Sequence, residues 1–283
     1  MKRILSTALV LSMLAAQAQI VTVESIERLN VGNDDAQIAQ AIAISPRGDY
    51  LLLSSDTKQG LVKWDLATSQ GTVLATGSIN GSEVNISDDG SRVTFEEVSF
   101  HNGRRQSAVK AIRPATGELE TVTSVGRHQS PVISRDENAS GKPSLTHHHL
   151  KLYITRDGVT RQLAPAGEEE NYIWASLSPD GSRVLCYVSG RGAFVCDIDG
   201  TNVVSMGDIT APKWWDDNTI VGMDEVDDEY CVIASAIVMR TIGGTEQTLT
   251  GDDVIATYPL PCRDSGKIAF STPDGGIYMI HVK

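Results

Sequence analysis

Six glycines recur along this chain at nearly even intervals, and each opens a polar loop after a short apolar or β-branched segment. Successive members are 40–49 residues apart, in the set Gly32, Gly77, Gly126, Gly167, Gly207 and Gly251. Repeats with a period in the forties are typical of β-propellers, in which each repeat folds as one four-stranded blade. The sequence therefore predicts an all-β fold of six antiparallel, four-stranded blades.

A second marker follows each glycine by about a dozen residues and supports the same period. It is a turn of the form Ser-x-Asp-Gly, seen at Ser178-Pro179-Asp180-Gly181, and a strand-like run over 183–188 follows it. In such a turn Pro fixes φ, Asp bonds the local backbone and Gly accepts a positive φ. We expect these turns to join the innermost strand of each blade to its second strand. Other copies, some of them decayed, begin at Ser45, Ser87, Ser134, Asp216 and Cys262.

The repeat over 178–184, with hairpin segments such as 61–66 and 194–200, resembles those of TolB-type propellers, relatives of the WD-repeat family. The resemblance implies one propeller domain over residues 19–283, without the separate α/β domain that TolB carries. It leaves the function open. Relatives with this fold include periplasmic scaffolds, the propellers that gate prolyl oligopeptidases and metal-using polysaccharide lyases.

The first eighteen residues have the pattern of a secretory signal peptide. Lys2 and Arg3 precede an apolar stretch over 4–16, and Ala16-Gln17-Ala18 is a small-x-small cleavage site. The stretch is shorter than the roughly 18 apolar residues that span a bilayer, and no later segment approaches that length. We therefore expect residues 19–283 to be periplasmic or secreted, with no transmembrane segment.

The net charge argues against nucleic acid as a partner. The chain carries a net charge of −12, and loss of residues 1–18 would make it −14. Proteins that bind a phosphate backbone need clustered positive charge. A protein or peptide partner of the cell envelope, with basic character, is the better expectation.

The last repeat is one strand short, which predicts how the ring closes. It offers strands over 256–261, 267–271 and 277–282, whereas residues 20–31 form a strand-like segment with no preceding strands. We expect this N-terminal strand to complete the last blade, because such closure leaves no open sheet edge.

The loops that enter the innermost strands and the second-to-third hairpins should share one face of the ring. This acidic rim carries far more acidic than basic residues, including Glu168, Glu169, Glu170 and the segment 224–229. It could attract a cation or a basic partner. The simpler interpretation is that charged loops keep an exported protein soluble.

The innermost strands and their entry loops should line the central channel, where small ligands or peptide tips bind. In Trp214-Trp215, strand alternation predicts that one ring faces the channel while the other packs between blades. For each candidate taken alone, packing is the simpler role. The predicted channel-mouth residues are Asn33, Asn80, His128, Asn171, Tyr172, Trp174, Asp208, Lys213, Trp214 and Tyr258.

The triplet His147-His148-His149 is the clearest candidate for metal chemistry. His147 and His149 could offer imidazoles to one divalent ion, with Glu168 to Glu170 near the same face. A structural site usually needs four convergent ligands, so we interpret the triplet as an exposed polar turn, with a metal site as the alternative.

Two cysteines are expected to face each other across a hairpin. If residues 190–192 form its loop, Cys186 lies directly opposite Cys196, within disulfide range in an oxidising compartment. A disulfide and two free thiols both remain open.

Local catalytic motifs are missing from the sequence. It contains no Gly-x-Ser-x-Gly elbow, no His-Glu-x-x-His motif and no phosphate-binding glycine loop. We therefore predict an exported, non-catalytic propeller that binds a protein or peptide. The alternative is a metal-dependent lyase or hydrolase of carbohydrates with its site in the channel. An oligosaccharide-binding protein that stacks sugars on Tyr172, Trp174 and Trp214 is a third possibility.

Overall fold

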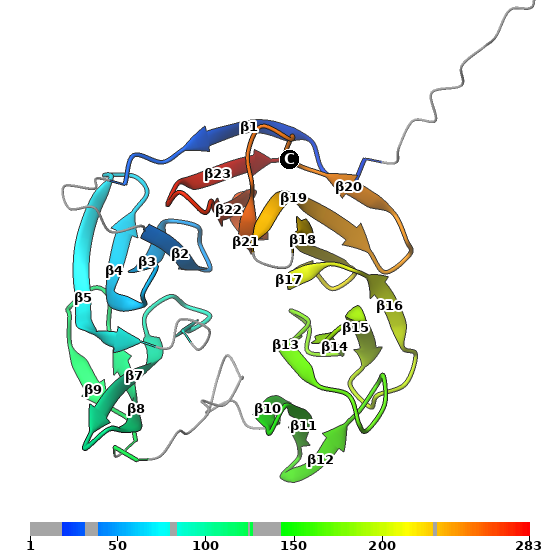
Figure 1. Cartoon of the computed structure of the whole chain (residues 1–283), viewed down its shortest axis with the longest axis horizontal. Helices are drawn as coiled ribbons and strands as arrows, with labels where there is room; N and C mark the ends of the chain where they lie inside the picture. The colour runs from blue at the N-terminus through cyan, green and yellow to red at the C-terminus, as the bar shows by residue number, and fades with distance from the viewer. Residues whose placement is uncertain (1–18, 32–38, 80–83, 124, 127–142, 229–230) are drawn as a thin grey trace, which may run out of the picture.

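The computed structural model describes residues 19–31, 39–79, 84–123, 125–126, 143–228 and 231–283. These residues form an all-β structure without an α-helix, and the one short 3-10 helix is η2 (Arg263–Ser265). The sheets lie around a common centre (Figure 1). The predicted signal peptide and three predicted site residues, Asn33, Asn80 and His128, lie outside the described residues.

Three sheets have four antiparallel strands each. Two follow a simple up-and-down order, and the N-terminal strand completes the third. The first comprises β13 (Tyr172–Leu177), β14 (Arg183–Val188), β15 (Gly192–Asp197) and β16 (Val204–Gly207). The second comprises β17 (Thr210–Asp216), β18 (Thr219–Asp227), β19 (Val232–Thr241) and β20 (Glu246–Thr248). The third comprises β21 (Thr257–Cys262), β22 (Lys267–Ser271), β23 (Ile277–Val282) and β1 (Val23–Arg28).

The remaining strands form a three-stranded and an eight-stranded sheet. The smaller one comprises β10 (Ser144–His148), β11 (Lys151–Arg156) and β12 (Val159–Leu163). The larger one joins two groups through pairing of β5 with β7, at Ser78 with Val98. Its groups are β2 (Ala39–Ile44), β3 (Tyr50–Ser55), β4 (Gln59–Asp65) and β5 (Gln70–Ile79), then β6 (Asn85–Ile86), β7 (Val93–His101), β8 (Arg104–Ile112) and β9 (Leu119–Thr121).

The N-terminal strand completes the last sheet, which confirms the predicted closure. β1 pairs antiparallel with β23, from Val23 opposite Val282 to Arg28 opposite Tyr278. Thr22 and Lys283 exchange two further backbone hydrogen bonds, of 2.8 and 2.9 Å. The sheet edge that β23 would otherwise expose is thereby covered.

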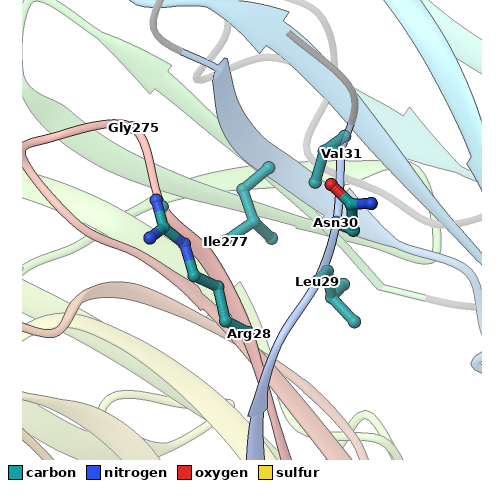
Figure 2. A pocket seen from close by; sticks show the side chains of 7 residues that line it. Arg28, Leu29, Asn30, Val31, Gly275 and Ile277 are labelled. Carbon is teal, nitrogen blue, oxygen red and sulfur yellow. The ribbon is translucent and has the colours of Figure 1, made fainter.

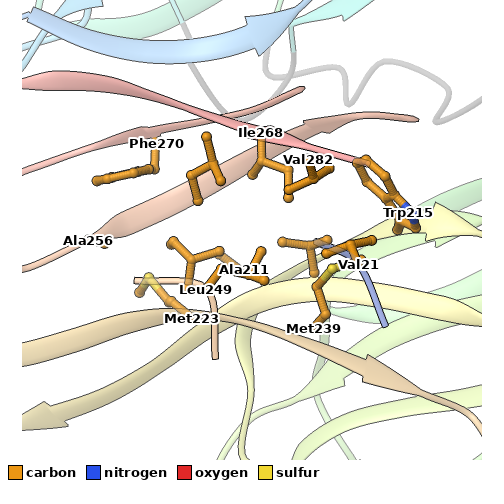
Figure 3. Packing of buried hydrophobic residues seen from close by; sticks show 13 residues of the cluster. Val21, Ala211, Trp215, Met223, Met239, Leu249, Ala256, Ile268, Phe270 and Val282 are labelled. Atoms are coloured by element: carbon orange, nitrogen blue, oxygen red, sulfur yellow. The ribbon is translucent and has the colours of Figure 1, made fainter. Parts of the chain in front are cut away.

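Neighbouring sheets pack face to face and enclose separate apolar cores. Figure 3 shows the core between the β17–β20 sheet and the last sheet, where Met223 and Met239 oppose Ile268, Phe270 and others. Phe270 and Ile268 are fully buried. A large apolar side chain contributes about 1.5–3 kcal/mol when it is fully buried. The β13–β16 sheet, the β17–β20 sheet and the last sheet each contribute to two of these cores, so packing covers both of their faces.

The Ser-x-Asp-Gly turns are closed by their own side chains. Ser178 Oγ donates to Asp180 Oδ1 at 2.6 Å and accepts from the Arg183 amide at 2.9 Å. The Ser182 amide donates to the same carboxylate oxygen at 2.9 Å. The Ser178 hydroxyl bond is the main reason why the pKa of Asp180 falls to about 2. The turn after β6 repeats these bonds between Ser87, Asp89, Ser91 and Arg92.

Candidate functional site

Three of the innermost strands, β13, β17 and β21, carry a β-bulge near the point where each one begins. In β13, Trp174 and Ala175 lie between the pairs Ile173–Tyr187 and Ser176–Leu185, so two residues oppose one. Trp174 has a left-handed backbone, with φ of 49°. A bulge of this kind re-aims a side chain and ends regular pairing. β17 and β21 repeat it, with Ala211 (φ 46°) before Pro212 and Tyr258 (φ 53°) before Pro259.

Local sequence explains why these bulges are tolerated. Pro212 and Pro259 have no amide hydrogen, so they lose no ladder hydrogen bond at the unpaired position. In β18 a glycine, Gly222, opposes the bulge of β17. A Cβ atom there would lie 2.8 Å from Ile209 Cγ2 and 3.0 Å from the Thr210 carbonyl oxygen. The close approach of the two backbones therefore requires glycine.

The bulge in β13 places the Trp174 ring against Tyr187 of β14. The two ring centroids are 5.2 Å apart and the rings meet edge to face, at 66°. This is a favoured geometry for aromatic pairs. Trp174 is half-buried, and it also packs against the core of the β17–β20 sheet.

Two carboxylates lie near the same pair. Burial raises the pKa of Tyr187, and the negative charges of Asp208 and Glu225 raise it further. Asp208 is exposed in the loop between β16 and β17, and Glu225 is half-buried on β18. We call Trp174, Tyr187, Asp208 and Glu225 the mouth cluster. It combines two aromatic rings with two acids at the place where the innermost strands begin.

Tyr258 adds an exposed aromatic side chain on the next sheet. It is 43% exposed, which is unusual for a residue on an innermost strand of this chain. Its backbone amide donates to Met223 Sδ at 3.4 Å, two residues before Glu225 on β18. Tyr258 therefore flanks the mouth cluster.

The structure places the described channel candidates in three kinds of surroundings. Trp174 contacts Tyr187, and Asp208 is near enough for its charge to raise the pKa of Tyr187. Asn171 and Lys213 are exposed, on the loop that enters β13 and on β17. Tyr172 is fully buried instead. Its hydroxyl accepts from the Ala166 amide at 3.0 Å and donates to the Gly167 carbonyl oxygen at 2.8 Å, which holds the entry loop in place.

The expectation that one tryptophan of Trp214-Trp215 faces the channel was wrong. Their exposed fractions are 9% and 8%, and they belong to two different cores. The indole of Trp214 donates to the Ser176 carbonyl oxygen at 3.3 Å. Alternation does send the two rings to opposite faces of the sheet, but neighbouring sheets cover both faces.

The two histidines considered for metal binding differ in their surroundings. His147 lies in β10 opposite Leu152, and its Nε2 atom is buried with no hydrogen-bond partner. Burial lowers the pKa of His147. His149 and Leu150 form the exposed hairpin turn, with φ of 49° and 61°, and the His148 and His149 rings lie 4.1 Å apart. Across the described ranges, no three His, Cys, Asp or Glu side chains gather as metal ligands would.

The predicted alignment of Cys186 with Cys196 was also wrong. Cys186 pairs with Phe194 and Cys196 pairs with Val184, because Val188 already pairs with Gly192. The hairpin loop thus comprises 189–191, one residue earlier than expected. Both thiols are free and buried in one core. Burial raises the pKa of each thiol, and that of Cys196 reaches about 12.

Two surface hollows lie away from the mouth cluster. Figure 2 shows the first, of about 370 Å³, between the end of β1 and the turn before β23; Arg28, Asn30, Gly275 and Ile277 help to line it. The second, of about 300 Å³, lies among the Ser-x-Asp-Gly turns near Tyr50 and Lys63. Neither contains a residue predicted for the channel.

The sequence did not predict Tyr187 as a site residue, nor that Glu225 lies near it. Tyr187 lies in a regular strand, and only the bulge in β13 brings Trp174 to it. Pro212 and Pro259 could have indicated the bulges of β17 and β21, since proline within an innermost strand marks a bulge, but β13 contains no proline.

Comparison with solved structures identifies the fold class as a β-propeller. A putative TolB from Agrobacterium tumefaciens superposes with a TM-score of 0.56 and 18% identity, over 91% of this chain and 96% of that one. An oligogalacturonate lyase in complex with manganese gives 0.52 and 17%, over 85% and 76%. The Cps50 (Swd1) propeller domain of Myceliophteria thermophila gives 0.52 and 10%, over 87% and 97%. Such identities show the fold alone.

No protein-family model and no curated protein matches the sequence. Within the described ranges, none of the helical structure is long and apolar enough to cross a bilayer.

Proposed function

We propose that this chain is an exported, non-catalytic six-bladed propeller that binds a basic peptide or protein segment at the mouth cluster. In this assignment the eight-stranded sheet is two blades, joined where β5 and β7 pair only over Ser78 and Ile79. The β10–β12 sheet, with its three described strands, counts as a further blade.

The mouth cluster is the observation that carries the proposal. A lysine or arginine side chain can pair with Asp208 and Glu225 while its charged head lies against the rings of Trp174 or Tyr187. A cation against an aromatic face gains about 0.5–2 kcal/mol, more when water is excluded. The bulge supports this role, because a left-handed non-glycine residue costs about 1–3 kcal/mol and is found at binding sites.

Calorimetric titration of residues 19–283 with lysine- and arginine-rich peptides tests the proposal. We expect binding to basic peptides and none to acidic peptides of equal length. Trp174→Ala should weaken the affinity at least tenfold, because it removes the ring that packs against Tyr187. Tyr153→Ala, on β11 away from the mouth cluster, is the matched control. Equal binding of basic and acidic peptides would contradict the proposal.

Export is a separate part of the proposal. It rests on the basic and apolar pattern of residues 1–18. Cell fractionation and N-terminal sequencing of the native protein would test it. A mature chain that begins near Gln19 in the envelope or medium supports export, and an intact chain in the cytoplasm contradicts it.

A metal-dependent carbohydrate lyase or hydrolase is the second candidate. The buried, unpartnered Nε2 atom of His147 favours it, since a neutral imidazole nitrogen is a good ligand for zinc or manganese. Titration of each metal into wild type and His147→Gln distinguishes the candidates. Micromolar binding that the variant loses would favour the enzyme, and no binding by wild type would exclude this site.

A further inference from the structure

Two hairpins continue beyond the sheets to which they belong. β7 and β8 have nine residues each, and β18 and β19 have nine and ten, whereas β14 and β15 have six each. Pairing of β7 with β5 ends at Val98, and pairing of β18 with β17 ends at Met223. Residues 99–106, and residues 224–228 with 231–234, therefore extend as two-stranded ribbons.

The ribbon over 99–106, the basic ribbon, ends in positive and aromatic side chains. Phe100 is 72% exposed, and His101, Arg104 and Arg105 are exposed beside it. The turn is Asn102-Gly103 with φ of 50° and 72°, the tight hairpin geometry that these residues favour. Arg105 lies 3.7 Å from the buried carboxylate of Glu96, which anchors the ribbon to the sheet.

The acidic ribbon, residues 224–228 with 231–234, has the complementary character. Asp224, Asp227 and Asp228 are exposed, and Val226 and Ile233 are 56% and 51% exposed. Large apolar side chains exposed among charges at the end of a ribbon indicate a contact surface. Each ribbon thus offers apolar groups beside charge of one sign, and the signs are opposite.

The two ribbons lie on opposite sides of the ring and on the same face. Figure 1 shows β7–β8 and β18–β19 across the centre from each other. The group β2–β5 and the last sheet separate them along one arc, and the β10–β12 and β13–β16 sheets separate them along the other. Both ribbons continue the second and third strands of an up-and-down unit, so both extend from one face.

This placement restricts the partner. A surface that engages both ribbons must carry an acidic patch and a basic patch with the same separation, in reversed order. A second copy of this chain, turned over about an axis in the plane between the rings, meets that condition. The axis places the basic ribbon of each copy over the acidic ribbon of the other, so one contact is made twice.

We propose that the protein self-associates face to face through these two ribbons. The ribbons meet before the shorter hairpins, which keeps other acidic loops of the face, such as that of Asp208, apart. The net charge of −12 opposes association and weakens the dimer. The proposal goes beyond peptide binding. The acidic ribbon includes Glu225 of the mouth cluster, so the variants that test self-association change residues outside that cluster.

Sedimentation velocity with charge-reversal variants tests it. We expect wild type to approach twice the monomer mass as concentration rises. Arg104→Glu and Asp227→Lys should each weaken the dimer at least tenfold, because each change makes both symmetric contacts repulsive. An equal mixture of the two variants should dimerise again, since both contacts between unlike copies are then attractive. Arg263→Glu, on the opposite face, is the matched control.

Three outcomes would overturn the proposal. They are a wild type that stays monomeric at every concentration, a mixture that behaves like either variant alone, and growth beyond the dimer, which would contradict two-fold closure. Circular dichroism of each variant shows whether it is folded. Restored dimerisation in the mixture also proves that both are folded.

Discussion

The two ends of the innermost strands differ in what they repeat. Where these strands end, the turns at Ser87 and Ser178 repeat both side chains and hydrogen bonds. Where they begin, the backbone bulge recurs but its side chain changes, from Trp174 to Ala211 to Tyr258. The repeated side chains therefore specify the ring, and the candidate site arises where the repeats differ from one another.

The largest expected effect comes from the bulge backbone. Gly222→Ala should lower the free energy of unfolding by about 2–3 kcal/mol, because its Cβ would meet Ile209 and the Thr210 backbone. Urea denaturation measures the change. The control is Gly243→Ala, where the nearest atom to a new Cβ is 3.8 Å away. Similar stabilities for the two variants would show that the bulge is not tightly packed.

A smaller effect is expected at the turns. Ser178→Ala should cost about 1–2 kcal/mol, because the part-buried amide of Arg183 loses the buried Ser178 hydroxyl as its acceptor. Ser189→Ala, at an exposed loop position, is the control. Equal stability of the two would contradict the structural role of the turn.

The same variant, Ser178→Ala, should also change how the stability of the fold depends on pH. The folded pKa of Asp180 is about 2, below its ordinary 3.8, so its contribution is complete above pH 3.8 and is lost as pH falls toward 2. Ser178→Ala should raise this pKa, because it removes the main cause of the shift. Carboxylate titration by NMR would detect the change, and the variant should lose less stability than wild type in acid.

The smallest effect is a titration at the mouth. Asp208→Asn should lower the pKa of Tyr187 toward the ordinary value of 10.0, without full recovery, since burial is the larger cause. A raised folded pKa stabilises the fold below pH 10, and that contribution is lost as pH rises through the folded value. Ultraviolet difference titration, with Tyr187→Phe to identify the transition, measures it. An unchanged pKa would place Asp208 away from the cluster.

Periodicity was enough to predict the all-β class and the completion of the last sheet by residues 20–31. Those features depend on turns and strand counts, which local residue types encode. Predicting the candidate site required the register of the strand pairs. Bulges and loop positions set that register, and simple in-out alternation of side chains does not account for them. One extra residue in β13 brings Trp174 to Tyr187, and a hairpin loop that lies one position earlier than expected, over 189–191, separates Cys186 from Cys196. The prediction that Trp214 or Trp215 faces the channel was wrong for another reason: neighbouring sheets cover both faces of β17.

The pairing of β1 with β23 also governs when the molecule can finish folding. During synthesis β1 emerges before its partner β23, which follows some 250 residues later, so this pairing is strongly non-local. Until Val282 is made, β1 has no partner and the ring stays open. A factor that holds the chain extended until β23 has been made would therefore protect β1 from pairing with another molecule.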